Sequence, residues 1–217
     1  MSAEPAGAQL AGSVGLDSDY RLRGYSLTNH HPALSGQLSY DDPSGGYASL
    51  SGLTEIGHDT RFLGVIANAG YAKRISRHVT LDAGVLRSQI RAAVPGAAGF
   101  KYTEVYAGAY VGPVTGRIYY SPDYRTRSQS TLYGELEAGF EPVPKWRLSG
   151  HVGLLTYLNS SILYRAGDSD RDWRVSVSRQ LGRLELHAAL SKGGPDIYYG
   201  YRLHRKAALV VGGSVNF

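Results

Sequence analysis

The chain has 217 residues, among them 28 glycines, 17 tyrosines and no cysteine, and its formal net charge is +5. The lack of cysteine excludes a disulfide framework and a thiolate metal site. The sequence contains no run of about 18 apolar residues, which excludes a membrane-spanning helix. Its basic residues are scattered singly, and this distribution disfavours nucleic acid as a partner.

The first twelve residues, MSAEPAGAQLAG, have neither the basic segment nor the apolar core of a secretion signal. We interpret them as the start of a mature chain behind an added Met1. Residues 1–9 are expected to form a flexible periplasmic N-terminus. No shift in composition marks a boundary further along, and all-β barrels of this length occur as one domain. We therefore predict a single domain over residues 1–217.

Short segments in which apolar and polar residues alternate run through the whole chain, separated by turn residues. Nowhere do apolar residues recur at the three-and-four spacing of an amphipathic helix. The pattern predicts an all-β fold, a single antiparallel up-and-down transmembrane β-barrel of about 12 strands. The predicted strands are residues 10–22, 33–41, 46–54, 62–72, 79–88, 100–111, 114–122, 129–140, 145–157, 172–181, 183–191 and 206–217.

The links between these strands alternate in length. Bacterial outer-membrane barrels show this asymmetry, with tight periplasmic turns and longer extracellular loops. An even number of strands then places both termini on the periplasmic side. The short links are residues 41–46, 73–78, 111–116, 141–145 and 180–183, and the long links are 23–32, 55–61, 91–99, 122–128, 159–171 and 192–205.

The two faces of the strands differ in polarity, as the last strand shows. Leu209, Val211 and Phe217 share one face, which we expect to contact lipid, whereas Ser214 and Asn216 share the other. A soluble sandwich would bury the apolar face instead, and alternation alone does not decide. The apolar faces are thin and rich in glycine and alanine, which favours the barrel. Aromatic residues near strand ends are predicted to form membrane-interface girdles; they are Tyr40, Tyr47, Tyr71, Trp146, Trp173 and Phe217.

The segment VGLDSDYRLRGYSLTNHHPALSGQLSY (14–40) resembles the opening signature of the TorF family of porins. In that family an early strand reads S-D-Y-R-x-R-G-x-S, followed by P-A-L and a glycine-rich strand. A weaker resemblance continues through residues 101–124 and 130–153, and the compact link at 55–61 is a departure that could alter the pore mouth. The resemblance implies an outer-membrane barrel whose terminal aromatic residue is presented to the assembly machinery. The matching residues are Ser18, Asp19, Tyr20, Arg21, Arg23, Gly24, Ser26, Pro32, Ala33 and Leu34.

Charged and histidine side chains on the predicted inner face are the candidate pore-lining residues. Charges in a barrel interior must be paired or hydrated. They form either a structural ion-pair network or a selectivity lining for solutes, and the two roles are compatible. The set is Asp17, Asp19, Arg21, Arg23, Asp82, Glu104, Arg117, Glu135, Glu137, Arg147, His151, Arg174, Glu185 and His187. Asp19, Arg21 and Arg23 are expected on one strand face about 7 Å apart, where register and folding are their favoured role.

Other sites in the sequence are weaker. His30 and His31 are more simply solvated than bound to metal. The aspartates at 168, 170 and 172 have calcium-loop spacing, but Trp173 stands where that loop needs glycine. No nucleophile motif or phosphate-binding loop occurs. We predict no catalytic residue, no metal and no cofactor.

The sequence therefore predicts an integral protein of the bacterial outer membrane, a porin through which small hydrophilic or charged solutes diffuse passively. Expected partners are outer-membrane lipid, lipopolysaccharide and the outer-membrane assembly machinery, which would bind Phe217. One alternative is a non-conducting structural or adhesion barrel with surface-binding loops. A lipid-modifying outer-membrane enzyme is a further alternative.

Overall fold

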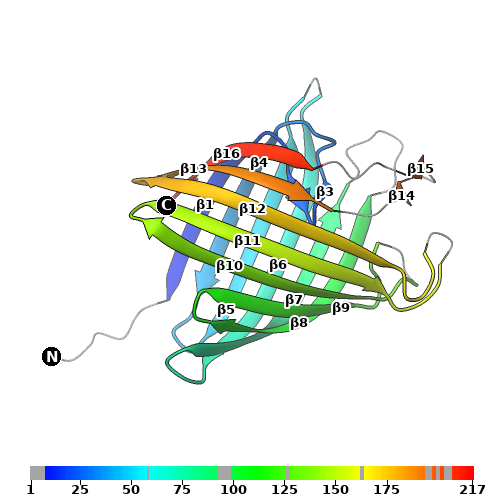
Figure 1. Cartoon of the computed structure of the whole chain (residues 1–217), viewed down its shortest axis with the longest axis horizontal. Helices are drawn as coiled ribbons and strands as arrows, with labels where there is room; N and C mark the ends of the chain where they lie inside the picture. Colours follow the sequence, from blue (N-terminus) through cyan, green and yellow to red (C-terminus); the bar gives the residue numbers. More distant parts are fainter. Residues whose placement is uncertain are drawn as a thin grey trace.

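The computed structural model describes residues 8–57, 59–91, 99–125, 128–161, 164–193, 197–198, 201–202 and 207–217. Twelve strands form one closed antiparallel barrel, as predicted (Figure 1). Among the described residues, no helix is long and apolar enough to cross a membrane. The barrel strands are β1 (Gln9–Asp17), β4 (Ala33–Asp41), β5 (Gly46–Glu55), β6 (Arg61–Arg74), β7 (Val79–Ile90), β8 (Phe100–Val111), β9 (Val114–Ser121), β10 (Thr131–Val143), β11 (Trp146–Tyr157), β12 (Ser169–Leu181), β13 (Leu184–Lys192) and β16 (Ala208–Asn216).

Two short hairpins lie outside the barrel sheet. One consists of β2 (Arg21–Leu22) and β3 (Tyr25–Ser26), and the other of β14 (Ile197–Tyr198) and β15 (Tyr201–Arg202). The long links and the short links fall at opposite ends of the barrel, and both termini lie at the short-link end (Figure 1). In the first short turn, hydrogen bonds from Ser44 hold the pKa of Asp42 below its usual value. This arrangement confirms the predicted alternation; the predicted flexible N-terminus falls largely outside the described residues.

The barrel closes where the first strand meets the last. β1 pairs with β4 on one side and with β16 on the other. The Gly12 N–H donates to the Phe217 carbonyl at 2.8 Å, and the Phe217 N–H donates to the Gly12 carbonyl at 2.9 Å. Closure pairs backbone groups that an open sheet edge would leave without partners, which a hydrocarbon environment requires.

Apolar side chains cover the outside of the barrel. Leu16, Leu136 and Val211 all have exposed side chains, and Phe217 is 65% exposed. Along β16, the alternate residue Val210 points inward and is buried. The face that ends in Phe217 therefore lies outside, as predicted, and these strands form no sandwich core. A closed barrel with an apolar exterior and a charged interior is the arrangement of an outer-membrane β-barrel.

The first barrel strand is shorter than predicted. It ends at Asp17 instead of Leu22, and residues 18–28 turn into the barrel. Arg23 and Gly24 have φ angles of 50° and 72°, so they form a two-residue left-handed turn between β2 and β3. The predicted end of this strand was wrong and the long link begins at residue 18 instead of 23, because the turn lets residues 21–26 pair with themselves instead of with the barrel.

Candidate functional site: a lumen cavity bounded by an inward hairpin

Residues 18–28, which include β2 and β3, form the inward hairpin. This hairpin is organised around one carboxylate. Asp19 is buried and accepts hydrogen bonds from Arg21 Nη1 at 2.8 Å and from Ser26 Oγ at 2.5 Å. It also accepts the Thr28 hydroxyl at 3.1 Å. Arg21 in turn donates from Nε and Nη2 to the Gly24 carbonyl. Asp19, Arg21 and Ser26 of the S-D-Y-R-x-R-G-x-S stretch thus hold the hairpin together through their side chains.

The tip of the hairpin is bonded to the opposite wall of the barrel. Arg23 donates from both terminal nitrogens to the carboxylate of Glu104 on β8, at 2.9 and 2.7 Å. Its guanidinium carbon lies 3.9 Å from the centroid of the Tyr133 ring. Both charges are buried, with the Arg23 side chain 12% exposed and that of Glu104 1% exposed. A two-pronged pair of this kind sets both distance and orientation, so the hairpin spans the lumen from β1 to β8.

Apolar side chains hold the other side of the hairpin. Leu27 packs into a buried cluster with Leu53 and Leu63 of the β5–β6 wall. Tyr20, Leu22 and Tyr25 of the hairpin pack against the same cluster. Leu53 and Leu63 are inward apolar residues of the strands, and the hairpin covers them from the lumen side.

The lumen beside β5 to β9 contains a hydrogen-bonded network. Asp82 is buried, accepts Arg117 Nε at 2.9 Å and is bonded to the hydroxyl of Tyr47. The Tyr106 hydroxyl donates to Asn68 at 2.8 Å. Tyr47 therefore points inward, and its predicted place in a membrane-interface girdle was wrong. Along β5, Leu50 is exposed whereas Leu53 is buried, so the odd-numbered positions, Tyr47 among them, lie on the inner face.

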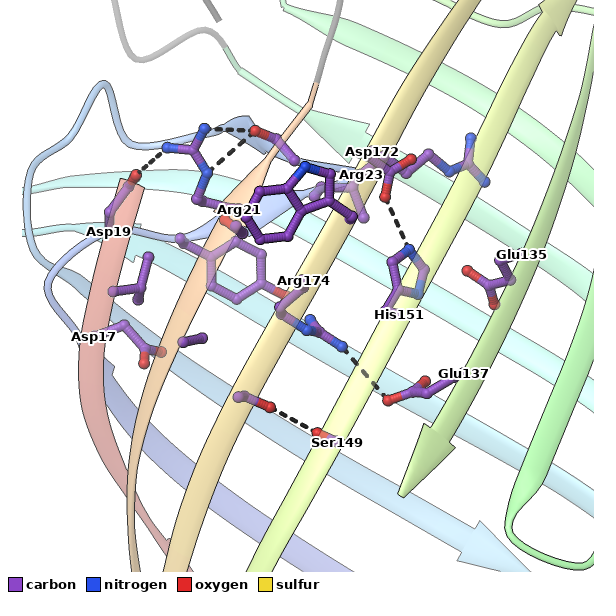
Figure 2. A pocket seen from close by; sticks show the side chains of 18 of the residues that line it. Asp17, Asp19, Arg21, Arg23, Glu135, Glu137, Ser149, His151, Asp172 and Arg174 are labelled. Carbon is purple, nitrogen blue, oxygen red and sulfur yellow. Dashed lines mark hydrogen bonds and ion pairs between the residues drawn. The ribbon is translucent and has the colours of Figure 1, made fainter. Parts of the chain in front are cut away.

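A cavity of about 540 Å³ lies in the rest of the lumen, below and beside the hairpin (Figure 2). Its walls come from the hairpin and from inward side chains of β10 to β13, β16 and β1, with a few from β6 to β9. Of the fourteen predicted pore-lining residues, all except Asp82 and Arg117 line it. Asp19, Arg21 and Arg23 reach it from the hairpin instead of from a strand face. Polar lining residues that the prediction did not include are, among others, Tyr119, Tyr133, Ser149, Asp172, Ser176, Ser178 and Ser191.

Alternation along the strands could have identified several of these missed residues. Asp172 lies two positions before Arg174 on β12, and Ser191 lies four positions after His187 on β13. Each shares the inner face with a residue that the sequence did predict. The prediction had Asp172 as the first and Ser191 as the last residue of a strand, and it considered Asp172 only in a calcium-loop spacing.

Carboxylates in the cavity are bonded to histidines and arginines from neighbouring strands. His151 Nε2 lies 2.8 Å from Asp172, and the Tyr133 hydroxyl contacts the same carboxylate at 3.2 Å. His187 Nε2 lies 2.7 Å from Asp17. The contacts of Asp172 join β10 and β11 to β12, and Figure 2 shows the one with His151. The contact of His187 joins β13 to β1, so these pairs link strands of the wall as well as line the cavity.

The weaker metal candidates do not come together. His30 faces Asp19 at 3.4 Å, whereas His31 contacts Glu55 at 2.6 Å. Asp170 accepts the hydroxyl of Tyr157 and Asp172 pairs with His151, while Asp168 accepts the backbone N–H of Arg165. Within the described ranges, no group of three histidine, aspartate or glutamate side chains is placed to hold a metal ion.

Most of the remaining predicted interface aromatics lie on the outer surface. Tyr40, Tyr71, Trp146 and Phe217 have exposed side chains. Trp173 pairs in register with the exposed Val152, but it is half-buried and also borders the cavity. Arg179 lies with its guanidinium carbon 5.2 Å from the centroid of the Trp146 ring, near the short-link end. Trp146 thus lies next to a cation, as is common at a membrane boundary.

Solved structures with the same fold are outer-membrane porins and channels. The NanC porin aligns with a TM-score of 0.61 at 11% identity, over 95% of this chain and 99% of that one. The KdgM porin aligns with a TM-score of 0.58 at 12% identity, again over 95% and 99%. An outer-membrane channel from Pseudomonas putida F1 aligns with a TM-score of 0.53 at 12% identity, over 99% of this chain and 97% of that one. At this identity the likeness establishes the fold alone.

No curated protein matches the sequence. A family model, in contrast, matches residues 2–193, which include the inward hairpin and most of the barrel. That family is described as a bacterial protein of unknown function, and the name TorF that the opening signature suggested is not the name it carries. The matched segment covers well over half of the chain, and the protein therefore belongs to the Gcw_chp family of bacterial proteins.

Proposed function

We propose that this protein is a porin of the bacterial outer membrane, through which small hydrophilic or charged solutes diffuse passively. The observation that carries the proposal is the cavity of about 540 Å³ inside the closed barrel, lined by charged and hydroxyl side chains. Polar walls suit hydrated solutes, and a cavity of this size holds a small one. The resemblance of residues 14–40 to the TorF porins and the fold shared with NanC and KdgM support the same function.

In this proposal the solute path runs off the barrel axis. The network of Asp82, Arg117 and Tyr106 lies on the β5–β9 side, whereas the cavity follows β10 to β13. The hairpin narrows the lumen above the cavity, because Arg23 bonds it to Glu104 on the far wall. Passage past the hairpin would then select for small solutes, and the charged lining would select among them.

The experiment that tests the proposal is single-channel recording of the refolded protein in a planar bilayer. Discrete current steps in KCl that are absent with heat-denatured protein are expected. A barrel that is fully folded, as judged by a heat-dependent shift on a gel, and that never conducts would overturn the porin proposal.

A non-conducting structural or adhesion barrel is the second candidate, and the hairpin is the observation that favours it. The buried Arg23–Glu104 pair and the apolar cluster around Leu27 both hold the hairpin across the lumen. In a plugged barrel, replacing residues 20–27 by a short glycine-serine linker would create a conductance that the wild-type protein lacks. In a porin, the same change would enlarge a conductance that already exists.

A further inference from the structure

One wall of the cavity carries two arginines that form no strong ion pair with any described residue. Arg147 on β11 extends over Gly139, and it forms no ion pair with any described residue. Arg174 on β12 contacts Glu137 at 3.5 Å, and both side chains are about half exposed, at 45% and 47%. A contact of this length between hydrated groups is weak, so both guanidiniums are open to another anion.

A buried hydroxyl lies beside Arg174, on the neighbouring strand. Ser191 on β13 pairs in register with Arg174, lines the cavity and is 4% exposed. Its Oγ has no hydrogen-bond partner among the described residues. A buried hydroxyl without a partner is unfavourable, so this side chain is a donor ready for an acceptor that enters the cavity.

Two further hydroxyls lie between the arginines. Ser149 and Ser176 are partners in register and lie 2.6 Å apart, oxygen to oxygen (Figure 2). Arg147 pairs in register with Ser178, which lies two residues after Ser176 on β12. Arg174 lies two residues before Ser176 on the same strand. Two residues of a strand span about 7 Å, so the backbones of the two arginines lie about 14 Å apart along the wall, with the serines at the midpoint.

Most carboxylates of the cavity cannot compete for these groups. Asp172 is bonded to His151, Asp17 to His187 and Asp19 to Arg21. Glu104 is bonded to Arg23, and Glu135 accepts the hydroxyl of Tyr119 at 2.9 Å. Only Glu137 touches either arginine of the wall, as far as the described residues show. Glu185 on β13 also lines the cavity, and it has no hydrogen-bond or ion-pair partner within the described ranges.

We propose that Arg147, the Ser149–Ser176 pair, Arg174 and Ser191 form a track of binding positions for oxyanions, namely solutes that carry a carboxylate or phosphate group. Guanidinium and hydroxyl donors match the oxygens of both groups. Several binding positions of moderate affinity, spaced along a wall, allow an anion to enter the cavity and also to leave it. The conduction part of this inference rests on the proposed porin function, whereas the binding part does not.

The binding part is tested by titrating the refolded barrel in detergent with citrate and, separately, with inorganic phosphate. We expect saturable binding that weakens about tenfold or more in Arg174→Gln and by severalfold in Ser191→Ala. Glu137→Gln removes the competing carboxylate and should strengthen binding. Arg179→Gln is the matched control, because Arg179 lies on the same strand but faces Trp146 outside. Wild-type protein that binds neither anion, or an Arg174→Gln variant that binds as wild type does, would overturn the track.

The conduction part is tested by the zero-current potential in a KCl gradient and by the block of KCl current with citrate. We expect preference for chloride over potassium in the wild type, reduced in Arg147→Gln and Arg174→Gln and unchanged in Arg179→Gln. A conducting barrel that prefers potassium would overturn the track and leave the porin function intact. Citrate binding without any conductance would support the track and overturn the porin function.

Discussion

Arg23 and Glu104 lie 81 residues apart in the chain and meet inside the barrel, joined by two hydrogen bonds of 2.9 and 2.7 Å. The pair lies where the hairpin tip touches β8, under the rings of Tyr119, Tyr124 and Tyr133. It is the one contact between the hairpin and that wall in which both partners carry a full charge, among the described residues. Because water is largely excluded there, each charge depends on the other.

Removal of one partner should destabilise the barrel. Glu104→Gln leaves the Arg23 guanidinium buried without a counter-charge, and such a loss typically costs about 3–5 kcal/mol. We expect the urea midpoint of unfolding in detergent or vesicles to fall accordingly. Glu137→Gln is the control, since its partner Arg174 is half exposed and hydrated. Equal midpoints for the two variants would mean that the Arg23–Glu104 pair does not hold the hairpin.

Gly24 is a second point at which the hairpin is sensitive. Its φ angle is 72°, and a Cβ built on it would lie 2.5 Å from the Cα of Gly193 at the end of β13. Gly24→Ala should therefore lower stability by about 1–3 kcal/mol through strain and displacement of backbone. Gly36→Ala is the matched control, because a Cβ there meets nothing within 4 Å. Thermal or urea unfolding of both variants checks the difference, and a tolerated Gly24→Ala would place the turn elsewhere.

The position of the cavity in the lumen predicts where water-soluble reagents react. The chain has no cysteine, so introduced thiols react without background. Ser178→Cys lies in the cavity and should react rapidly with a charged methanethiosulfonate reagent. Ser121→Cys, at a position with no exposed surface, should react far more slowly. Labelling in vesicles, followed by mass spectrometry, measures both rates, and similar rates would argue against a cavity confined to the β10–β13 side.

An introduced arginine should impair folding on the outer face of the barrel but not on the inner face. Leu136 is exposed on the lipid side of β10, whereas Ser176 lines the cavity two strands away. An arginine on the lipid face costs up to about 2–4 kcal/mol at the bilayer midplane. Leu136→Arg should therefore fold poorly into vesicles while Ser176→Arg folds normally. The folded fraction on a gel run without heating measures both, and equal folding would mean that the outer face does not contact lipid.

The last residue is predicted to matter for closure. Phe217 exchanges two backbone hydrogen bonds with Gly12, and a Cβ at Gly12 would lie 2.5 Å from its ring. Gly12→Leu should therefore displace the ring and slow folding more than Gly150→Leu, whose Cβ meets nothing within 4 Å. The rate of appearance of the folded band in vesicles is the measurement. Identical rates would show that the ring does not contribute to the β1–β16 seam.

Alternation and link length, together with thin apolar faces and aromatic residues near strand ends, were enough to predict the barrel. A period of two with an apolar outer face, repeated twelve times between short and long links, is compatible with few other folds. The same alternation placed Glu104, Glu135, His151 and His187 on the inner face, because side-chain direction along a strand follows from local backbone geometry.

Contacts between distant segments were not predictable in this way. The sequence of residues 18–26 alternates much as a barrel strand does, yet it folds inward, because Arg23 finds Glu104 and Leu27 finds Leu53 only in the closed barrel. The same holds for Tyr47, which bonds to Asp82 two strands away. The sequence by itself determined the strand number, the two faces and the charged lining, through local periodicity. Only the tertiary structure decided which part of the lumen holds the hydrogen-bonded network and which holds the cavity, because that depends on how side chains from opposite walls share a limited volume.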